Sequence, residues 1–296
     1  MLRRTLFFGN NYHLSTLNHQ LKAASKEDGE IKSIPIEDIG YIVFEHPQIT
    51  FTQSVIRLLA ENNTAVIFCD EKFHPSSMLL HLDTNYVQTE RFKLQIAASE
   101  PLKKQLWKQT IQAKIQNQAL LLKKIRQNPT PLLTKRRMVK SGDISNEEAK
   151  AARIYWKLLM GDEFIRERFG AAPNAALNYG YAILRAAVAR ALAASGLLAT
   201  LGIHHRNKYN SFCLADDIME PYRPFVDEIV YEMQEQGYNT EVLGKEEKAA
   251  LLKVLTVDTF FEKEVSPLQI ALLKTTNSLV KCFKQEQRQL LYPNLK

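Results

Sequence analysis

Three short segments in the second half of the chain carry carboxylate or imidazole side chains in spacings that could hold a metal ion. The first is SNEEAKAARIYW, which contains Glu148. On a helix, Glu148 shares a face with Tyr155 and Leu159 through i+7 and i+11 spacing, so it should point towards the packed side. A carboxylate there needs a partner, and a metal ion is an adequate one. The structural alternative is a capping box, because Ser145 precedes Glu148 by three positions.

The second segment is LGIHHRNKYN, a predicted loop in which His204 and His205 follow a glycine. Neutral imidazole is a common metal ligand, so either histidine could bind an ion. The alternative is that both are polar residues with ordinary hydrogen-bond partners.

The third segment is LADDIMEPYRP, which predicts a helix with Asp217 and Glu220 at i, i+3 spacing. Their carboxylates would lie on one face and repel each other unless a cation lay between them. Mg²⁺ prefers one or two carboxylates together with water and phosphate oxygens. Arg223 follows one turn later and could neutralise the acids or bind a phosphate. The alternative is an acidic first turn favoured by the helix dipole.

Positive charge is concentrated in one stretch of the chain. The net charge is +7, yet the forty residues from Pro101 to Lys140 contain eleven Lys or Arg and no Asp or Glu. The rest of the chain contains the other 28 of the 39 basic residues and all 32 acidic ones, so it is slightly acidic. A stretch of one sign attracts polyanions, and nucleic acid is the usual partner. The alternative is a solvated helix face.

The elements that would position these groups change in type along the chain. In the first 80 residues, the short runs TLFF, IKSIPI, YIVF and TAVIFCD predict strands separated by turns. One helix is predicted among them, beginning after Thr52 and ending at the Asn62-Asn63 pair. The segment HPSSMLLHLDTN predicts a last strand that runs into a linker.

From about Gln88 onwards the pattern is helical. Apolar residues recur at near-helical spacing from Leu102 to Ile125, and the pair Pro129 and Pro131 is predicted to stop that helix. Three helices that each end before a glycine are predicted next, over 145–160, 173–195 and 214–236. At least two more helices are expected in the last sixty residues. The predicted class is α+β, with a small β-rich domain over 1–80 followed by a larger all-α catalytic domain over 81–296.

Several classes of protein are disfavoured. No apolar run reaches the roughly 18 residues that a membrane span needs, and the N-terminus lacks the pattern of a signal peptide. The three cysteines, Cys69, Cys213 and Cys282, are far apart and form no CxxC pair. This is typical of a reducing compartment and disfavours a thiolate zinc site. We expect a cytoplasmic protein with no membrane partner.

Taken in order, EAKAARIYW, LNYGYAILRA, LGIHHRNKYNSF and LADDIMEPYRPFVDE resemble the CRISPR-associated protein one family, the integrase of CRISPR adaptation. The version resembled is the one that accompanies type II systems. The phrases IPIEDIGYIVF and LLAENNTAVIFCDEKFHPS match as well, so the resemblance covers nearly the whole chain.

The resemblance implies a set of metal ligands. The family's ligands fall on Glu148, His205 and Glu220, with Asp217 as an auxiliary acid and His204 as second choice to its neighbour. The third ligand is Glu here, where many relatives carry Asp. The implied ion is Mg²⁺ or Mn²⁺, which polarises a phosphodiester and lowers the pKa of the attacking hydroxyl.

The resemblance also implies the reaction. The 3′ end of a captured DNA fragment attacks the edge of a CRISPR repeat, a transesterification, and with water as nucleophile the same site is a nuclease. We expect basic side chains to follow the phosphates without reading sequence. The predicted DNA-binding residues are Lys103, Lys108, Lys123, Arg126, Arg136, Arg137 and Arg223.

The implied partners are double-stranded DNA, both spacer precursor and repeat, and a second copy of the chain joined through the β-rich domains. Two such dimers would be bridged by a dimer of the small ferredoxin-like adaptation subunit, and the RNA-guided effector nuclease is a candidate partner. Two alternatives remain open from sequence. One is a stand-alone, structure-selective repair nuclease with the same metal site, and the other is a non-catalytic helical nucleic-acid-binding protein.

Overall fold

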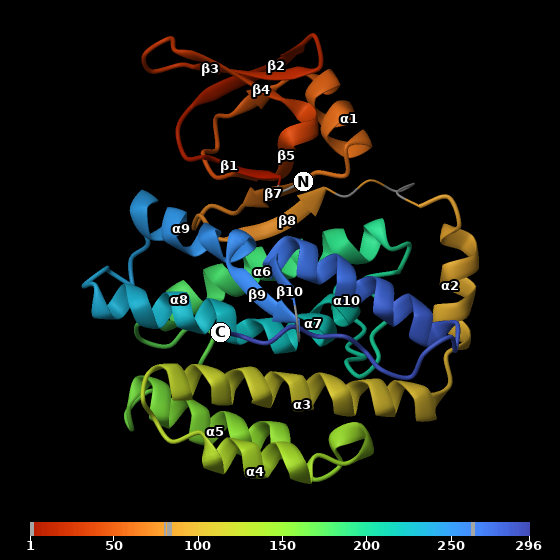
Figure 1. Ribbon diagram of the computed structural model, residues 1–296. Helices are drawn as coiled ribbons and strands as arrows, with labels where there is room; N and C mark the ends of the chain where they lie inside the picture. Colours follow the sequence, from red (N-terminus) through yellow and green to blue (C-terminus); the bar gives the residue numbers. More distant parts are fainter. Residues whose placement is uncertain (1–2, 80, 82–84, 262–263) are drawn as a thin grey trace. The chain divides into compact units, whose positions relative to one another are not determined.

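The predicted α+β class is confirmed, with most strands in the first part of the chain and most helices in the second (Figure 1). The computed structural model describes residues 3–79, 81, 85–261 and 264–296. The chain divides into two units, Met1–Tyr86 and Val87–Lys296, where we had placed the boundary after residue 80. No helix in the described residues is long and apolar enough to cross a membrane.

The first unit contains a mixed sheet whose middle strand is covered on both faces. All six residues of β5 (Ile39–Phe44) are buried, which explains why this segment is continuously apolar and does not alternate. The strands β1, β5 and β7 run parallel, and β8 pairs antiparallel with β7. The other bounds are β1 (Arg4–Phe8), β7 (Ala65–Cys69) and β8 (Pro75–Leu79). The linker predicted after β8 falls largely outside the described residues, on 80 and 82–84.

A second sheet in this unit is built around a tight hairpin. Its order is β4-β3-β2-β6, and Asn18 and His19 connect β2 to β3 with φ of 50° and 58°. Two positive φ values are what a two-residue hairpin turn requires. The bounds are β2 (Tyr12–Leu17), β3 (Gln20–Ser25), β4 (Ile31–Pro35) and β6 (Thr50–Phe51).

The helix predicted between these strands is confirmed as α1 (Gln53–Glu61), with Thr52 and Asn62 as its flanking residues. Its buried residues Val55 and Leu59 join the hydrophobic core of the first unit. A single 3₁₀ turn, η1 (Ile36–Asp38), precedes β5.

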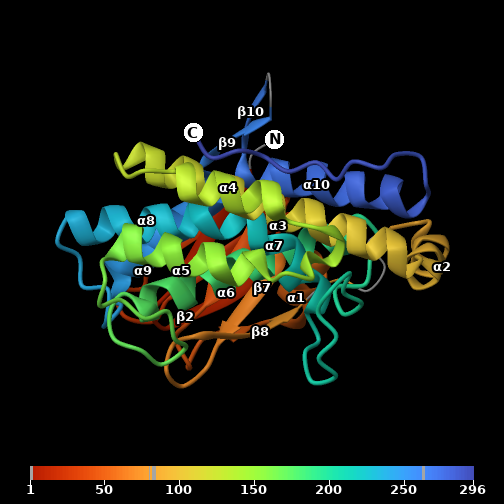
Figure 2. The same ribbon diagram turned by 90° about the horizontal axis from the view of Figure 1, so that it is seen from below.

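The second unit is a helical assembly in which α3, α4 and α5 form one layer over α7 and α8 (Figures 1 and 2). The helix α6 lies in the core and is buried on nearly every side. The bounds are α2 (Gln88–Ala97), α3 (Glu100–Lys124), α4 (Thr130–Met138), α5 (Glu147–Met160), α6 (Asn174–Ala194), α7 (Cys213–Met219), α8 (Arg223–Glu235), α9 (Lys245–Leu252) and α10 (Leu268–Phe283). The 3₁₀ turns are η2 (Ser141–Asp143), η3 (Glu220–Tyr222) and η4 (Lys253–Thr256).

The proline pair does not stop α3, contrary to our prediction. The helix ends at Lys124, and Arg126 adopts a left-handed φ of 62°. Pro131 instead lies in the first turn of α4, where its missing N–H has no helical partner to lose.

The helix predicted over 214–236 is interrupted. It divides into α7, the 3₁₀ turn η3 and α8, with Pro221 and Pro224 in the first turns of η3 and α8. Asp217 therefore lies in α7 while Glu220 begins η3, so the two acids do not share one regular helix.

The second unit is also not purely helical. The strands β9 (Asp258–Phe261) and β10 (Glu264–Pro267) form a short antiparallel pair, and Phe260 bridges to Asn294 near the C-terminus.

The contact between α6 and α8 is close enough to require glycine at position 180. A Cβ atom built on Gly180 would lie 2.4 Å from Cγ1 of Val226. We expect Gly180→Ala to lower the free energy of unfolding by about 1–3 kcal/mol through this overlap, although alanine is the better helix former. Denaturant unfolding measures the change. Adding Val226→Ala should recover part of the loss, whereas a Gly180→Ala variant as stable as wild type would contradict the close approach.

Candidate metal centre

The start of α5 leaves the Glu148 side chain free of a capping role. The flanking residue is Asn146, whose side chain accepts the backbone N–H of Ala149 at 3.3 Å. The carboxylate of Asp143 accepts the backbone N–H groups of Glu147 and Glu148 at 2.9 and 3.0 Å. The capping box that we considered between Ser145 and Glu148 is therefore not formed, because Asn146 and Asp143 already satisfy these N–H groups.

Glu148 and Glu220 both contact the ammonium of Lys114. The distances from Lys114 Nζ are 2.6 Å to Oε1 of Glu148 and 2.5 Å to Oε2 of Glu220. The other oxygen of Glu220 accepts Nε of Arg223 at 2.8 Å. The Lys114 side chain is only 11% exposed and that of Glu220 only 6%. Two predicted ligands from α5 and η3 thus meet at one buried cation supplied by α3.

The two cations keep Glu220 ionised despite its burial. Burial alone would raise the pKa of Glu220, but Arg223 and Lys114 outweigh it and hold that pKa at about 2. For Lys114, burial favours the neutral amine, yet Glu220 and Glu148 raise its pKa above the ordinary value. Glu220 and Lys114 are therefore both charged at neutral pH, as a buried charge with a paired partner can be.

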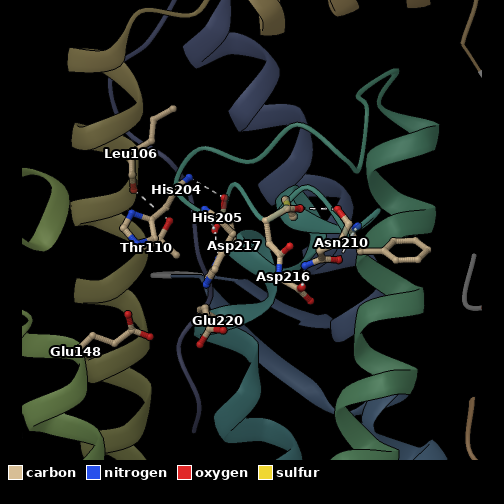
Figure 3. A network of polar contacts seen from close by, with 12 residues as sticks. Leu106, Thr110, Glu148, His204, His205, Asn210, Asp216, Asp217 and Glu220 are labelled. Atoms are coloured by element: carbon tan, nitrogen blue, oxygen red, sulfur yellow. Dashed lines mark hydrogen bonds and ion pairs between the residues drawn. The ribbon is translucent and has the colours of Figure 1, made fainter. Parts of the chain in front are cut away.

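The histidine loop between α6 and α7 is organised by Asp217 (Figure 3). Asp217 is fully buried and accepts the backbone N–H groups of His204 at 2.9 Å and His205 at 3.2 Å. It also bonds Nδ1 of His205 at 2.5 Å. A Cβ atom on Gly202 would lie 2.4 Å from the His205 carbonyl oxygen, so this turn needs glycine.

The two adjacent histidines have different surroundings. The ring of His204 stacks on that of Trp107 in α3, with the ring centres 4.1 Å apart and the ring planes at 1°. Burial lowers the pKa of His204. The hydrogen bond to Asp217 raises the pKa of His205, whose side chain is 45% exposed. With Nδ1 of His205 bonded to a carboxylate, Nε2 is the nitrogen left to bind a ligand.

The structure does not bring the predicted ligands into one finished cluster. In the described part of the chain, no three His, Cys, Asp or Glu side chains form a group that could hold a metal ion. Glu148 and Glu220 meet at Lys114, while His205 is turned towards Asp217. Glu148, His205 and Glu220 nevertheless come from three segments beside the same stretch of α3 (Figure 3). Asp217 contacts the histidine loop, and among the described residues its carboxylate forms no ion pair with Lys114 or Arg223, the cations that Glu220 binds.

Lys114 was predicted only as one charge of the basic stretch, and its pairing with the acids was missed. One signal was present in the sequence. Thr110, Lys114, Asn117 and Gln118 recur at helical spacing, and all except Lys114 are buried outright. Such a polar stripe on the packed face of a helix indicates internal partners. Asn117 confirms this by donating to the backbone carbonyl of Pro221 at 2.7 Å, which fixes η3 against α3.

A cavity of about 220 Å³ adjoins Glu220 and Lys114. The guanidinium groups of Arg223 and Arg166 lie 4.5 and 5.2 Å from the centre of the Tyr181 ring, which also borders it. Arg223, predicted to bind DNA, is thus partly neutralised by Glu220 and faces this cavity. The lining residues are Lys114, Gln118, Ala152, Trp156, Arg166, Tyr181, Glu220, Arg223 and Asp227.

The remaining predicted DNA-binding residues lie on α3, α4 and the turn between them. Lys123, Arg126, Arg136 and Arg137 are exposed, and within the described residues none forms an ion pair with a carboxylate. Lys108 is half-buried, and Lys103 has a weak pair with Glu100 at 3.8 Å. Part of the basic stretch therefore presents uncompensated charge, while Lys114 and Lys135 pair with acids of α5.

Known proteins resemble this chain in both sequence and fold. Residues 7–263 match the family model described as CRISPR associated protein Cas1. The chain is 39% identical over 266 residues to the CRISPR-associated endonuclease Cas1 of Neisseria meningitidis serogroup C (strain 8013), covering 89% of this chain and 86% of that protein. A casposase bound to integration product shares the fold with a TM-score of 0.82 at 20% identity, covering 98% of this chain and 92% of that one. A chain of a Cas6-RT-Cas1–Cas2 complex also shares the fold, with a TM-score of 0.75 at 20% identity. The match covers 99% of this chain and 36% of that one.

The buried carboxylate of Asp227 gives the second unit a pH dependence. Asp227 accepts the hydroxyl of Tyr155 at 2.7 Å and that of Tyr181, yet burial raises its pKa from 3.8 to about 6. A pKa that is higher in the folded protein contributes stability that is complete below pH 4 and is lost as the pH rises through 6. Two pKa units correspond to about 3 kcal/mol.

Asp227→Asn should remove this contribution while keeping the size of the side chain. We expect the unfolding free energy of the variant, relative to wild type, to improve by about 2–3 kcal/mol between pH 4 and pH 7. Urea unfolding at several pH values measures the difference. A constant gap between the two proteins across this range would show that Asp227 titrates normally.

Proposed function

Because this chain belongs to the CRISPR associated protein Cas1 family, we propose that Glu148, His205 and Glu220 hold the divalent metal ion of its DNA-joining reaction. The protein is an integrase of CRISPR adaptation, which inserts short duplex DNA into the CRISPR repeat array. The similarity to the Neisseria protein supports the type II-like version of the family.

One observation carries the metal proposal: carboxylates from α5 and η3 converge on a single buried cation. The lysine ammonium stands in the place that suits a divalent ion, since Mg²⁺ and Mn²⁺ favour carboxylate oxygens. The His205–Asp217 pair adds the arrangement common in metal sites, in which a carboxylate orients the ligating imidazole through its other nitrogen. This donor set fits Mg²⁺ or Mn²⁺.

The ion, when bound, would polarise the phosphodiester and lower the pKa of the attacking hydroxyl. The chain's own residues have separate tasks. Asp217 holds the histidine loop and fixes which nitrogen of His205 faces outward. Arg223 keeps Glu220 ionised and contributes positive charge to the adjacent cavity, where it could bind a phosphate.

The partners that we propose follow from the family. They are double-stranded DNA, as spacer precursor and as repeat, and a second copy of this chain. Support for a Cas2 partner comes from the shared fold with a chain of a Cas6-RT-Cas1–Cas2 complex. We further propose that a dimer of this small subunit bridges two dimers of the chain, with the RNA-guided effector nuclease as a candidate additional partner.

The ligand assignment is tested by single substitutions. Glu148→Ala, His205→Ala and Glu220→Ala should each reduce cutting and joining of DNA by about a thousandfold or more, because several kcal/mol of transition-state stabilisation depend on the ion. A labelled short duplex and a supercoiled repeat plasmid, with Mg²⁺ or Mn²⁺, provide the assay. Asp217→Asn should lower the activity only in part, because it acts through the orientation of His205. Added Mn²⁺ should offset this loss of activity.

The neighbouring His204→Ala is the matched control. Its ring is stacked on Trp107, so its loss should change activity far less than the loss of His205. Wild-type activity in Glu148→Ala would refute the site. Equal losses at both histidines would remove the distinction between ligand and neighbour, and complete inactivity of Asp217→Asn at all Mn²⁺ concentrations would make Asp217 a primary ligand.

The basic stretch is tested by the salt dependence of DNA binding. The triple variant in which Gln replaces Lys123, Arg136 and Arg137 should bind duplex DNA more weakly than wild type. The loss of affinity should be about the same for unrelated sequences, because phosphate contacts carry no base information. Each lost contact should flatten the slope of log affinity against log salt by about 0.9. Replacing Lys245, Lys253 and Lys281, which are exposed and lie outside the stretch, should leave the slope unchanged. Equal slopes for the two triple variants would remove the stretch from the DNA path.

A further inference from the structure

We infer that the ammonium of Lys114 and the divalent metal ion take the same place between Glu148 and Glu220, so that Lys114 must release these carboxylates when the ion binds. The inference rests on the metal site proposed above and adds a positioning role for Lys114. In this role the lysine holds the two carboxylates together until the ion replaces it.

The contacts of Lys114 are those of an internal counter-ion and differ from those of a DNA-binding residue. Its Nζ lies 2.6 Å from Glu148 Oε1 and 2.5 Å from Glu220 Oε2, and its side chain is 11% exposed. Lys123 and Arg126, further along the same stretch, are exposed. The bridge joins α3 to α5 and η3, segments that are otherwise brought together by separate contacts. Lys114 therefore sets the spacing of the two carboxylates.

Charge explains why the ammonium and the ion exclude each other. Glu148 and Glu220 carry two negative charges, and Lys114 and Arg223 balance them with two positive ones. A divalent ion bound to the same carboxylate oxygens would lie beside the ammonium, and the repulsion between them is strong at short range in a poorly solvated place. Arg223 contacts the other oxygen of Glu220 and can stay. Lys114 contacts the oxygens by which the two acids would share the ion, so it cannot stay.

The structure provides a place for the released ammonium. Lys114 lines the cavity of about 220 Å³ that also contacts Arg166, Arg223 and Asp227. Its four-carbon stem is flexible, so the head group can swing while the helix stays in place. In the cavity, Lys114 would join the guanidinium groups of Arg166 and Arg223. These three cations exceed the two carboxylates that also line the cavity, Glu220 and Asp227, and the excess positive charge suits a phosphate group of DNA. Binding of the ion would thereby make an anion-binding charge available next to it.

Replacing Lys114 with methionine separates this role from that of a permanent salt bridge. Met keeps much of the length of the side chain without its charge. We expect Lys114→Met to bind Mn²⁺ about tenfold or more tightly than wild type in titration calorimetry on the full chain, because no charge-assisted hydrogen bond must be given up. Without Mn²⁺ its melting temperature should fall below that of wild type, since Glu148 loses its cation and Glu220 keeps only Arg223. Saturating Mn²⁺ should restore most of this loss.

Two matched variants define the comparison. Lys135→Met removes another lysine that pairs with an acid of α5, Glu147 at 3.3 Å, and should leave the Mn²⁺ affinity unchanged. Glu148→Gln should abolish Mn²⁺ binding at this site. If wild type and Glu148→Gln bind Mn²⁺ equally, the metal assignment fails, and this inference fails with it. If Glu148→Gln loses Mn²⁺ while Lys114→Met binds it no more tightly than wild type, the metal assignment stands and the exclusion is overturned.

A measurement on the wild-type protein covers the case in which Lys114→Met does not fold. Acetylation of lysines by acetic anhydride, followed by peptide mass spectrometry, reports the accessibility of each amine. Labelling of Lys114 should rise severalfold on addition of Mn²⁺, while that of Lys135 should stay constant. Labelling of Lys114 that is the same with and without saturating Mn²⁺ would overturn the inference.

Discussion

Buried carboxylates in a helical core must each find positive charge or N–H donors, and this requirement organises the second unit. Glu220 satisfies it with Lys114 and Arg223, and Asp217 satisfies it with the backbone and ring of the histidine loop. Removing one partner of a buried pair leaves an uncompensated charge, which costs several kcal/mol. The segments that carry these residues are therefore held in one arrangement by their charges as well as by their apolar packing.

The helix α3 is the common support of that arrangement. Trp107 stacks on His204, Lys114 bridges the two glutamates, and Asn117 donates to the carbonyl of Pro221 and to that of Pro293 at 3.0 Å. One face of a single helix thus contacts the histidine loop, the start of α5, the turn η3 and the C-terminal segment. Displacement of α3 would change every distance within the candidate centre at once, so the site depends on a rigid element, as precise chemistry requires.

Two acids three residues apart have different tasks because the chain leaves the α-helix between them. The carboxylate of Asp217, in α7, contacts the histidine loop. Glu220 begins a 3₁₀ turn, and its carboxylate points to α3. Prolines 221 and 224 make this change of direction local, since neither can donate an N–H to a continuing helix. The division separates the group that orients an imidazole from the group that meets the cation.

Local patterns in the sequence were enough for the boundaries of many elements. Thr52 and Asn62 enclose α1, and Gly161 and Gly196 follow the ends of α5 and α6 with φ of 95° and 64°. The ordered motifs were enough for the family. These features depend on residues within about one helical turn or on phrases in a fixed order.

What only the tertiary structure decided are contacts between distant residues. Lys114 is 34 residues from Glu148 and pairs with it. The polar stripe on α3 indicates that Lys114 has an internal partner, but it does not say which residue that is. Asp217 and Glu220 likewise take different partners because each contacts a different segment, the histidine loop or α3. By contrast, the cap of α5 by Asn146 and Asp143 is a contact between near neighbours. The physical reason is that helix and turn preferences act over a few residues, whereas the pairing of a buried charge is settled by packing against segments far away in the chain.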